Sequence, residues 1–136
     1  MIDAACYSIV RDPNRFDVIC HSNQYRDIIS GLASGLAGSL GLGAGANIGN
    51  EVTMVEACHG AAPDIAGKGF ANPLALIQSA AILLERSRCH RVAMAVRDAI
   101  ENAIKTRKEL TPDLGGAGTT PSLTNEAANE AQRILM

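Results

Sequence analysis

The sequence predicts an α/β fold in which a small, partial sheet is flanked by helices within a single domain, residues 1–136. Two short runs of apolar and β-branched residues are typical of strands, and five other segments have helical character. A chain of 136 residues is one domain by length, and its content of 47% hydrophobic and 19% charged residues is globular rather than disordered.

The N-terminal part predicts a helix, a strand and a second helix. The first helix spans 3–11, where Asp3 suits the N-terminal end, and Pro13 ends it. Residues 16–20, FDVIC, form a short apolar run that predicts a buried strand. Residues 25–40 have helical spacing and a narrow surface of Gly, Ala and Ser. Each interior glycine costs about 0.5–1 kcal/mol relative to Ala, so packing must hold this helix together.

The remaining elements follow from local composition. In order, we expect a glycine-rich loop over 41–51, a strand over 52–56, a loop over 57–73, helices over 73–85 and 90–108, a loop over 111–122 and a helix over 124–135. The segment LALIQSAAILLE is apolar nearly all round, which predicts a buried helix. Because two strands alone are marginal, we expect missing partner strands or pairing with a second copy.

Composition excludes several classes of partner. The formal charge is −2, from 12 basic and 14 acidic residues, so no basic surface for nucleic acid or a membrane is expected. Aromatic residues make up 3% and Trp is absent, which argues against base stacking. No apolar run predicts a membrane span, and the N-terminus lacks the basic region of a signal peptide. Four cysteines without CxxC spacing indicate reduced thiols. We expect a cytoplasmic location, or the matrix of an organelle after processing.

The densest motif is EACHGAAPDIAGKGFANP, which spans residues 56–73. It follows a predicted strand and leads into a predicted helix. Its small residues expose backbone N–H groups and allow a ligand to approach closely. His59, Asp64, Lys68 and Asn72 add polar side chains. From the residues alone, a ligand-binding loop and an ordinary series of turns remain equal alternatives.

This motif resembles the cofactor loop of the decarboxylating β-hydroxyacid dehydrogenases, namely the isocitrate, isopropylmalate and homoisocitrate dehydrogenases, whose run is FEAVHGSAPDIAGKGIANP. Other segments resemble the same family in the same order: VRDPNRFDVI, NQYRDI, GLAGSLGLGAGANIG, LIQSAAILLE and TPDLGGAGTT. The resemblance implies a truncated fold that corresponds to the C-terminal part of the family's chain. GANIG followed by VEACHG is more similar to the NAD-type isocitrate dehydrogenases than to the isopropylmalate branch.

The resemblance implies an NAD site in the loop. The positions that wrap the adenosine half of the dinucleotide in the family are matched by His59, Gly60, Ala61 and Ala62. Asn72 matches the residue that binds the adenine. Asp64 matches the residue that holds the ribose hydroxyls in NAD-dependent members, and Asp64 and Ile65 stand where NADP-dependent relatives have Lys and Tyr. A carboxylate accepts from a 2′-hydroxyl but repels a 2′-phosphate, which favours NAD over NADP. The alternative is a loop retained only as inherited scaffold.

The resemblance also implies a degenerate site for Mg²⁺ or Mn²⁺. In the family, two aspartates one helical turn apart and a third from the partner subunit hold the cation. Asp27 matches the first of the pair, and Asp3 matches the partner-subunit aspartate. Gly31 replaces the second aspartate of the pair. Arg26 stands where the family has glycine, and its guanidinium opposes cation binding.

The family's catalytic residues have no counterpart in this chain, so we assign no catalytic residue. We therefore expect a truncated isocitrate dehydrogenase-like protein that retains an NAD-type adenosine loop and is not an autonomous oxidative decarboxylase. One alternative is a repurposed homodimeric interaction or inhibitor protein. Another is part of a split NAD-dependent isocitrate dehydrogenase, completed by a separate N-terminal half. We expect a homodimer, because the family packs the counterpart of residues 25–40 into an intersubunit helix bundle and an unpaired sheet edge also seeks a partner.

Overall fold

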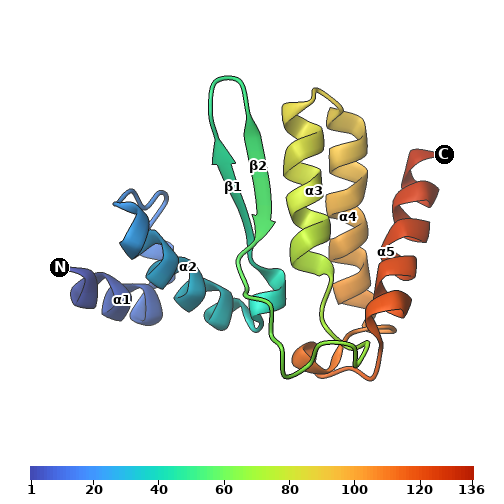
Figure 1. Cartoon of the computed structure of the whole chain (residues 1–136), viewed down its shortest axis with the longest axis horizontal. Coiled ribbons are helices and arrows are strands. Elements are labelled where there is room, and N and C mark those ends of the chain that lie inside the picture. The colour runs from blue at the N-terminus through green and yellow to red at the C-terminus, as the bar shows by residue number, and fades with distance from the viewer.

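The computed structural model describes all 136 residues as five α-helices and one small sheet, which confirms the mixed α/β prediction. The elements are α1 (Ile2–Arg11), α2 (Asn23–Ala37), β1 (Ala44–Ile48), β2 (Thr53–Ala57), α3 (Leu74–Arg86), α4 (His90–Thr106) and α5 (Thr120–Leu135). The β1–β2 hairpin, α3, α4 and α5 stand in a row, and α1 and α2 project away from the hairpin side (Figure 1). No helix has both the length and the apolar character needed to cross a membrane.

The core lies where α3, α4 and the start of α5 meet. Leu74 and Leu123 are fully buried there, and Ile100 and Ala103 of α4 pack against them. The spacing of Ile100 and Ala103 places both on one face of α4, as the apolar periodicity of that helix predicts. This arrangement holds the N-terminal ends of α3 and α5 close together.

The hairpin is the whole sheet. Strand β1 pairs antiparallel with β2, and Gly45 lies opposite Glu56. Helix α3 packs against this hairpin, and the Ser79 hydroxyl donates to the Glu56 carbonyl at 2.7 Å. The contact positions the end of β2, from which the loop of small residues departs.

Two predictions about strands are wrong. Residues 16–20 form no strand, and Val18 is 85% exposed, because no other strand lies beside them to complete a ladder. Conversely, residues 44–48 lie inside the predicted loop 41–51 but form β1. Ala and Gly have weak strand propensity, yet pairing with β2 overrides it.

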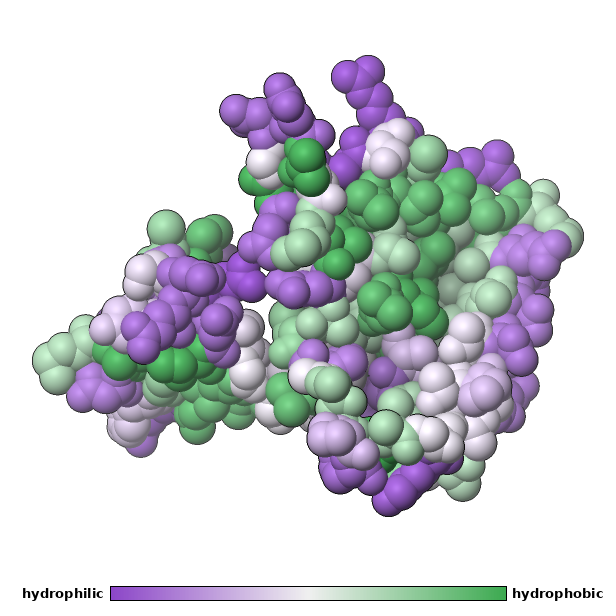
Figure 2. Space-filling view, viewed as in Figure 1, coloured by the Kyte–Doolittle hydropathy of each residue, from purple (hydrophilic) through white to green (hydrophobic).

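Two predictions about helices need correction. Helix α3 is not buried all round, since Leu76 is 61% and Leu83 is 42% exposed on the face turned away from the core. Figure 2 shows a hydrophobic surface over the α3–α4 region. Helix α5 begins at Thr120 rather than at 124. The Thr119 and Ser122 side chains form a capping box there, and Pro121 suits the first turn.

Candidate functional site

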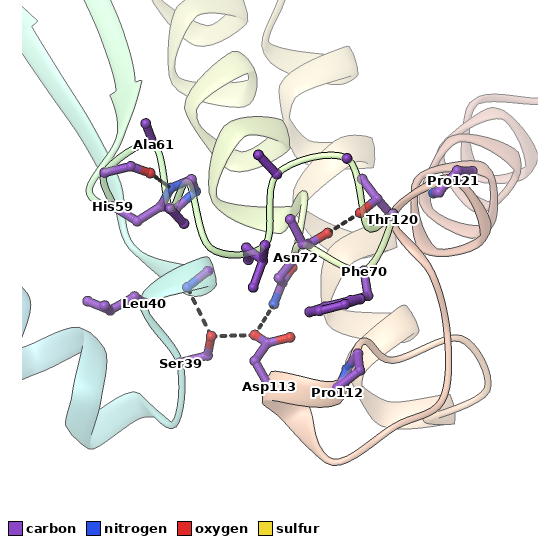
Figure 3. A pocket seen from close by; sticks show the side chains of 18 residues that line it. Ser39, Leu40, His59, Ala61, Phe70, Asn72, Pro112, Asp113, Thr120 and Pro121 are labelled. Carbon is purple, nitrogen blue, oxygen red and sulfur yellow. Dashed lines mark hydrogen bonds between the residues drawn. The ribbon is translucent and has the colours of Figure 1, made fainter.

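A cavity of about 740 Å³ lies beneath the loop that joins β2 to α3. Three segments far apart in the sequence form its walls (Figure 3). They are the turn 39–41 before β1, the loop 59–72, and residues 112–121 at the start of α5. The site therefore depends on how the hairpin, α3 and α5 pack against one another.

Glycines and hydrogen bonds together shape the loop 59–72. Gly67 and Gly69 have φ of +74° and +73°, in the left-handed region that favours glycine. The Gly69 carbonyl accepts from the Thr120 backbone N–H at 2.7 Å, and the Ala71 carbonyl accepts from the Thr120 hydroxyl at 2.5 Å. The first turn of α5 thereby holds the far end of the loop.

Asn72 and Asp113 form the polar centre of the cavity wall. Asn72 Oδ1 accepts from the backbone N–H of Leu74, the first residue of α3, at 2.9 Å, and Asn72 Nδ2 donates to Asp113 Oδ2 at 2.9 Å. The Ser39 hydroxyl donates to the same carboxylate oxygen and accepts from the Gly41 N–H at 2.9 Å. These bonds join all three walls of the cavity (Figure 3).

The cavity wall carries little charge, and its carboxylate, Asp113, already accepts hydrogen bonds from Ser39 and Asn72. Burial acts to raise the pKa of Asp113, but hydrogen bonds from the side chains of Ser39 and Asn72 help to outweigh it, and the pKa lies below its ordinary value. The lining contains no Lys or Arg. Leu40, Ile65 and Phe70 add apolar surface. The cavity suits an uncharged group with an apolar face, held by backbone and amide groups.

Six of the seven residues proposed for the cofactor line this cavity: His59, Gly60, Ala61, Ala62, Ile65 and Asn72. Asp64 is exposed and does not line the cavity, whereas Ala62 and Ile65, close to it in the chain, do. His59 lies with Nδ1 3.0 Å from the Gly60 carbonyl oxygen. The structure thus brings most of the predicted loop to one site.

Sequence reasoning missed Ser39, Phe70 and Asp113. The run TPDLGG that contains Asp113 lies in a predicted loop and in a segment that resembles the family, and the polar side chain between Pro and Leu is the available signal for a role in the site. Ser39 precedes a glycine-rich stretch and carries no signal of its own. Both residues become part of the site only because the chain folds back on Asn72.

The residues expected at the degenerate metal site do not fit a divalent cation in this chain. Asp27 Oδ1 lies 3.5 Å from Arg26 Nε, so a positive charge already neighbours the carboxylate. Gly31 offers no ligand, and Asp3 Oδ1 accepts from the Ala4 backbone N–H at 2.8 Å. No three His, Cys, Asp or Glu side chains gather in a way that could hold a metal ion.

Comparison with known proteins gives a consistent result. The family profile described as isocitrate/isopropylmalate dehydrogenase matches residues 1–130. The 3-isopropylmalate dehydrogenase of Archaeoglobus fulgidus is 49% identical over 128 residues, which are 94% of this chain and 39% of that protein. Catalytic subunit 5 of the mitochondrial NAD isocitrate dehydrogenase of Arabidopsis thaliana is 46% identical over 125 residues, 91% of this chain and 33% of that protein.

Solved structures agree with the sequence relatives. The crystal structure of isocitrate dehydrogenase from Methylococcus capsulatus matches 99% of this chain and 40% of its own, with a TM-score of 0.89 and 40% identity. The chain therefore spans only about a third to two-fifths of the length of these relatives. Both branches match at nearly equal identity, so the preference for the isocitrate branch stays a prediction.

Proposed function

The chain belongs to the isocitrate/isopropylmalate dehydrogenase family, and on that premise we propose that it binds the adenosine part of NAD in the cavity beneath the loop 59–72. We propose further that these 136 residues do not by themselves catalyse oxidative decarboxylation. The observation that carries the proposal is that residues matching the family's adenosine loop line one cavity together with Asn72 and Asp113.

The proposed binding mode uses the chain's own groups. The apolar walls and Phe70 accept the adenine, and the fixed Asn72 amide orients it. The exposed Asp64 carboxylate accepts from the ribose 2′-hydroxyl and repels a 2′-phosphate, which selects NAD over NADP. When bound, NAD supplies the acceptor for a hydride from an alcohol substrate.

The ionisable groups of the cavity support the absence of autonomous catalysis. Only His59 and Asp113 are ionisable among the lining side chains, and Asp113 is held as an acceptor by Ser39 and Asn72. Oxidative decarboxylation needs a base for the substrate hydroxyl and an acid for the enol. The described site offers no such pair beside a place for the substrate.

Calorimetric titration with NAD and then NADP, each with and without Mg²⁺, tests the proposal. NAD is expected to bind at least about tenfold more tightly than NADP, roughly 1.4 kcal/mol, with no dependence on Mg²⁺. Asp113→Asn is expected to weaken NAD binding by about tenfold, because it removes a charged acceptor that positions Asn72. Asp98→Asn, at an exposed carboxylate of α4, is the matched control and leaves binding unchanged. No heat and no thermal shift with either nucleotide would show that the loop is only inherited scaffold.

A second candidate is one half of a split NAD-dependent dehydrogenase. The exposed Leu76 and Leu83 of α3 and a sheet of only two strands favour it, because both are surfaces that further strands and helices cover in a larger fold. Co-expression with the N-terminal three-fifths of a relative tests this candidate. We expect a stable complex with isocitrate-dependent NAD reduction, and Leu83→Lys is expected to abolish both. Failure to associate contradicts it.

A further inference from the structure

We infer that the Arg26 guanidinium takes the place of a divalent cation in this chain, where it neutralises carboxylates and ties α2 to the β1–β2 hairpin. The family resemblance supplies the expectation of a cation near Asp27, and the structure places the Arg26 guanidinium beside that carboxylate. The inference does not depend on nucleotide binding.

Oxygen atoms surround the guanidinium on several sides. Arg26 Nε lies 3.5 Å from Asp27 Oδ1, and Nη2 lies 3.8 Å from Glu56 Oε1. Nη1 donates to Asn47 Oδ1 at 3.4 Å. Asn47 Nδ2 in turn donates to Glu56 Oε1 at 3.1 Å, which completes the group. Two carboxylates and an amide oxygen are the kind of ligands that a hard cation takes, and here they face a fixed organic cation.

The Arg26 guanidinium also connects α2 to the two strands, and no other polar contact joins α2 to them. Arg26 belongs to α2, Asn47 to β1 and Glu56 to β2. The Arg26 contacts are the only hydrogen bond and ion pair between α2 and the strands. A bound cation would hold the carboxylates only by ligation, whereas Arg26 does so through its own covalent attachment to α2.

Two departures from the family pattern, at positions 26 and 31, act together against cation binding. Arg26 places a permanent positive charge beside Asp27, which repels a divalent cation. Gly31 lies one helical turn after Asp27, on the same face, and brings no carboxylate. A Cβ at Gly31 would meet no atom within 4 Å, so a side chain can begin there without a clash. Gly31→Asp combined with a change at Arg26 is therefore a usable test.

A titration with Mn²⁺ alone tests whether Arg26 replaces the cation. The electron paramagnetic resonance signal of the free ion measures how much Mn²⁺ stays unbound. The unmodified chain is expected to leave Mn²⁺ free up to about 1 mM, the weak end of protein cation sites. Arg26→Ala combined with Gly31→Asp is expected to bind Mn²⁺ at least tenfold more tightly than the unmodified chain. The proposal is overturned if the unmodified chain binds Mn²⁺ below that concentration and Asp27→Asn abolishes the binding. It is equally overturned if the folded double variant gains no affinity.

Amide hydrogen exchange tests whether Arg26 holds the hairpin against α2. This test does not require the double variant to fold. Arg26→Ala alone is expected to speed amide exchange several-fold in residues 44–48 and 53–57. Arg133→Ala, which breaks an ion pair within α5 that involves no residue of the hairpin, is the matched control and leaves hairpin exchange unchanged. Unchanged exchange in Arg26→Ala would show that the guanidinium does not hold the hairpin.

Discussion

Asn72 shows how one residue can organise a site before any ligand arrives. Its amide oxygen accepts from the Leu74 backbone N–H and its amide nitrogen donates to Asp113, so the side chain is held in one orientation. Groups that are already ordered lose little entropy when a ligand binds. Because these bonds fix the Asn72 side chain, a larger residue in the neighbouring wall would displace it. The buried Gly41 lies directly against Asn72.

Gly41→Ala is expected to weaken NAD binding and lower the melting temperature. A Cβ at position 41 would lie 2.5 Å from the Cβ of Asn72, so the Asn72 side chain has to move. Overpacking of this kind costs about 1–3 kcal/mol. Calorimetry and thermal melts measure both effects.

Gly35→Ala is the matched control, because a Cβ there meets nothing within 4 Å. It replaces glycine inside α2 and is expected to stabilise the fold by about 0.5–1 kcal/mol without changing NAD affinity. Equal NAD affinity in Gly41→Ala and the unmodified chain would contradict the placement of Asn72 in the site.

At the scale of elements, α4 and α5 are joined by a polar cluster as well as by the core. Glu130 accepts from Asn102 Nδ2 at 2.7 Å and from Arg133 through two nitrogens. Hydrogen bonds from Arg133 and from Asn102 lower the pKa of Glu130 to about 2. The cluster therefore favours the ionised carboxylate in the folded state.

This pKa predicts an acid-dependent loss of stability. Because the folded state lowers the pKa, the stabilisation is fully present above the ordinary value of 4.5 and disappears as the pH falls toward about 2. Urea unfolding across this interval is expected to show a shallower pH dependence for Glu130→Gln than for the unmodified chain. Glu126→Gln, at a carboxylate of α5 with no ion pair, is the control. An unchanged pH dependence in Glu130→Gln would refute the role of the cluster.

The whole molecule has a small core for its length, with 18 of 136 residues buried. Helices α1 and α2 bury few side chains, yet they expose Tyr7, Val10, Ile28 and Leu36. These exposed apolar side chains are available for contact with another protein surface. We propose that they form the contact of the homodimer expected from the sequence; the interaction-protein alternative would use the same side chains.

Light scattering at about 10 μM is expected to show a dimer, whose population depends on concentration. Leu36→Lys places a charge on the exposed face of α2 and is expected to yield a monomer. Leu76→Lys, on the exposed face of α3, is the control that should remain dimeric. A monomeric unmodified chain would contradict a homodimer through α1 and α2.

The sequence predicted five helical segments, a strand at 52–56 that the structure has at 53–57, the loop motif and the resemblance to the family, because these signals lie in residues that are neighbours along the chain. Periodicity reports what a helix or strand buries, and a motif reports local composition. Tertiary structure decided that 44–48 rather than 16–20 forms the second strand, since a strand exists only where a partner pairs with it. It also decided that Asp113 meets Asn72 and Ser39, which lie 41 and 74 residues away in the chain. Such contacts depend on how α3 and α5 pack, and no local pattern records that packing.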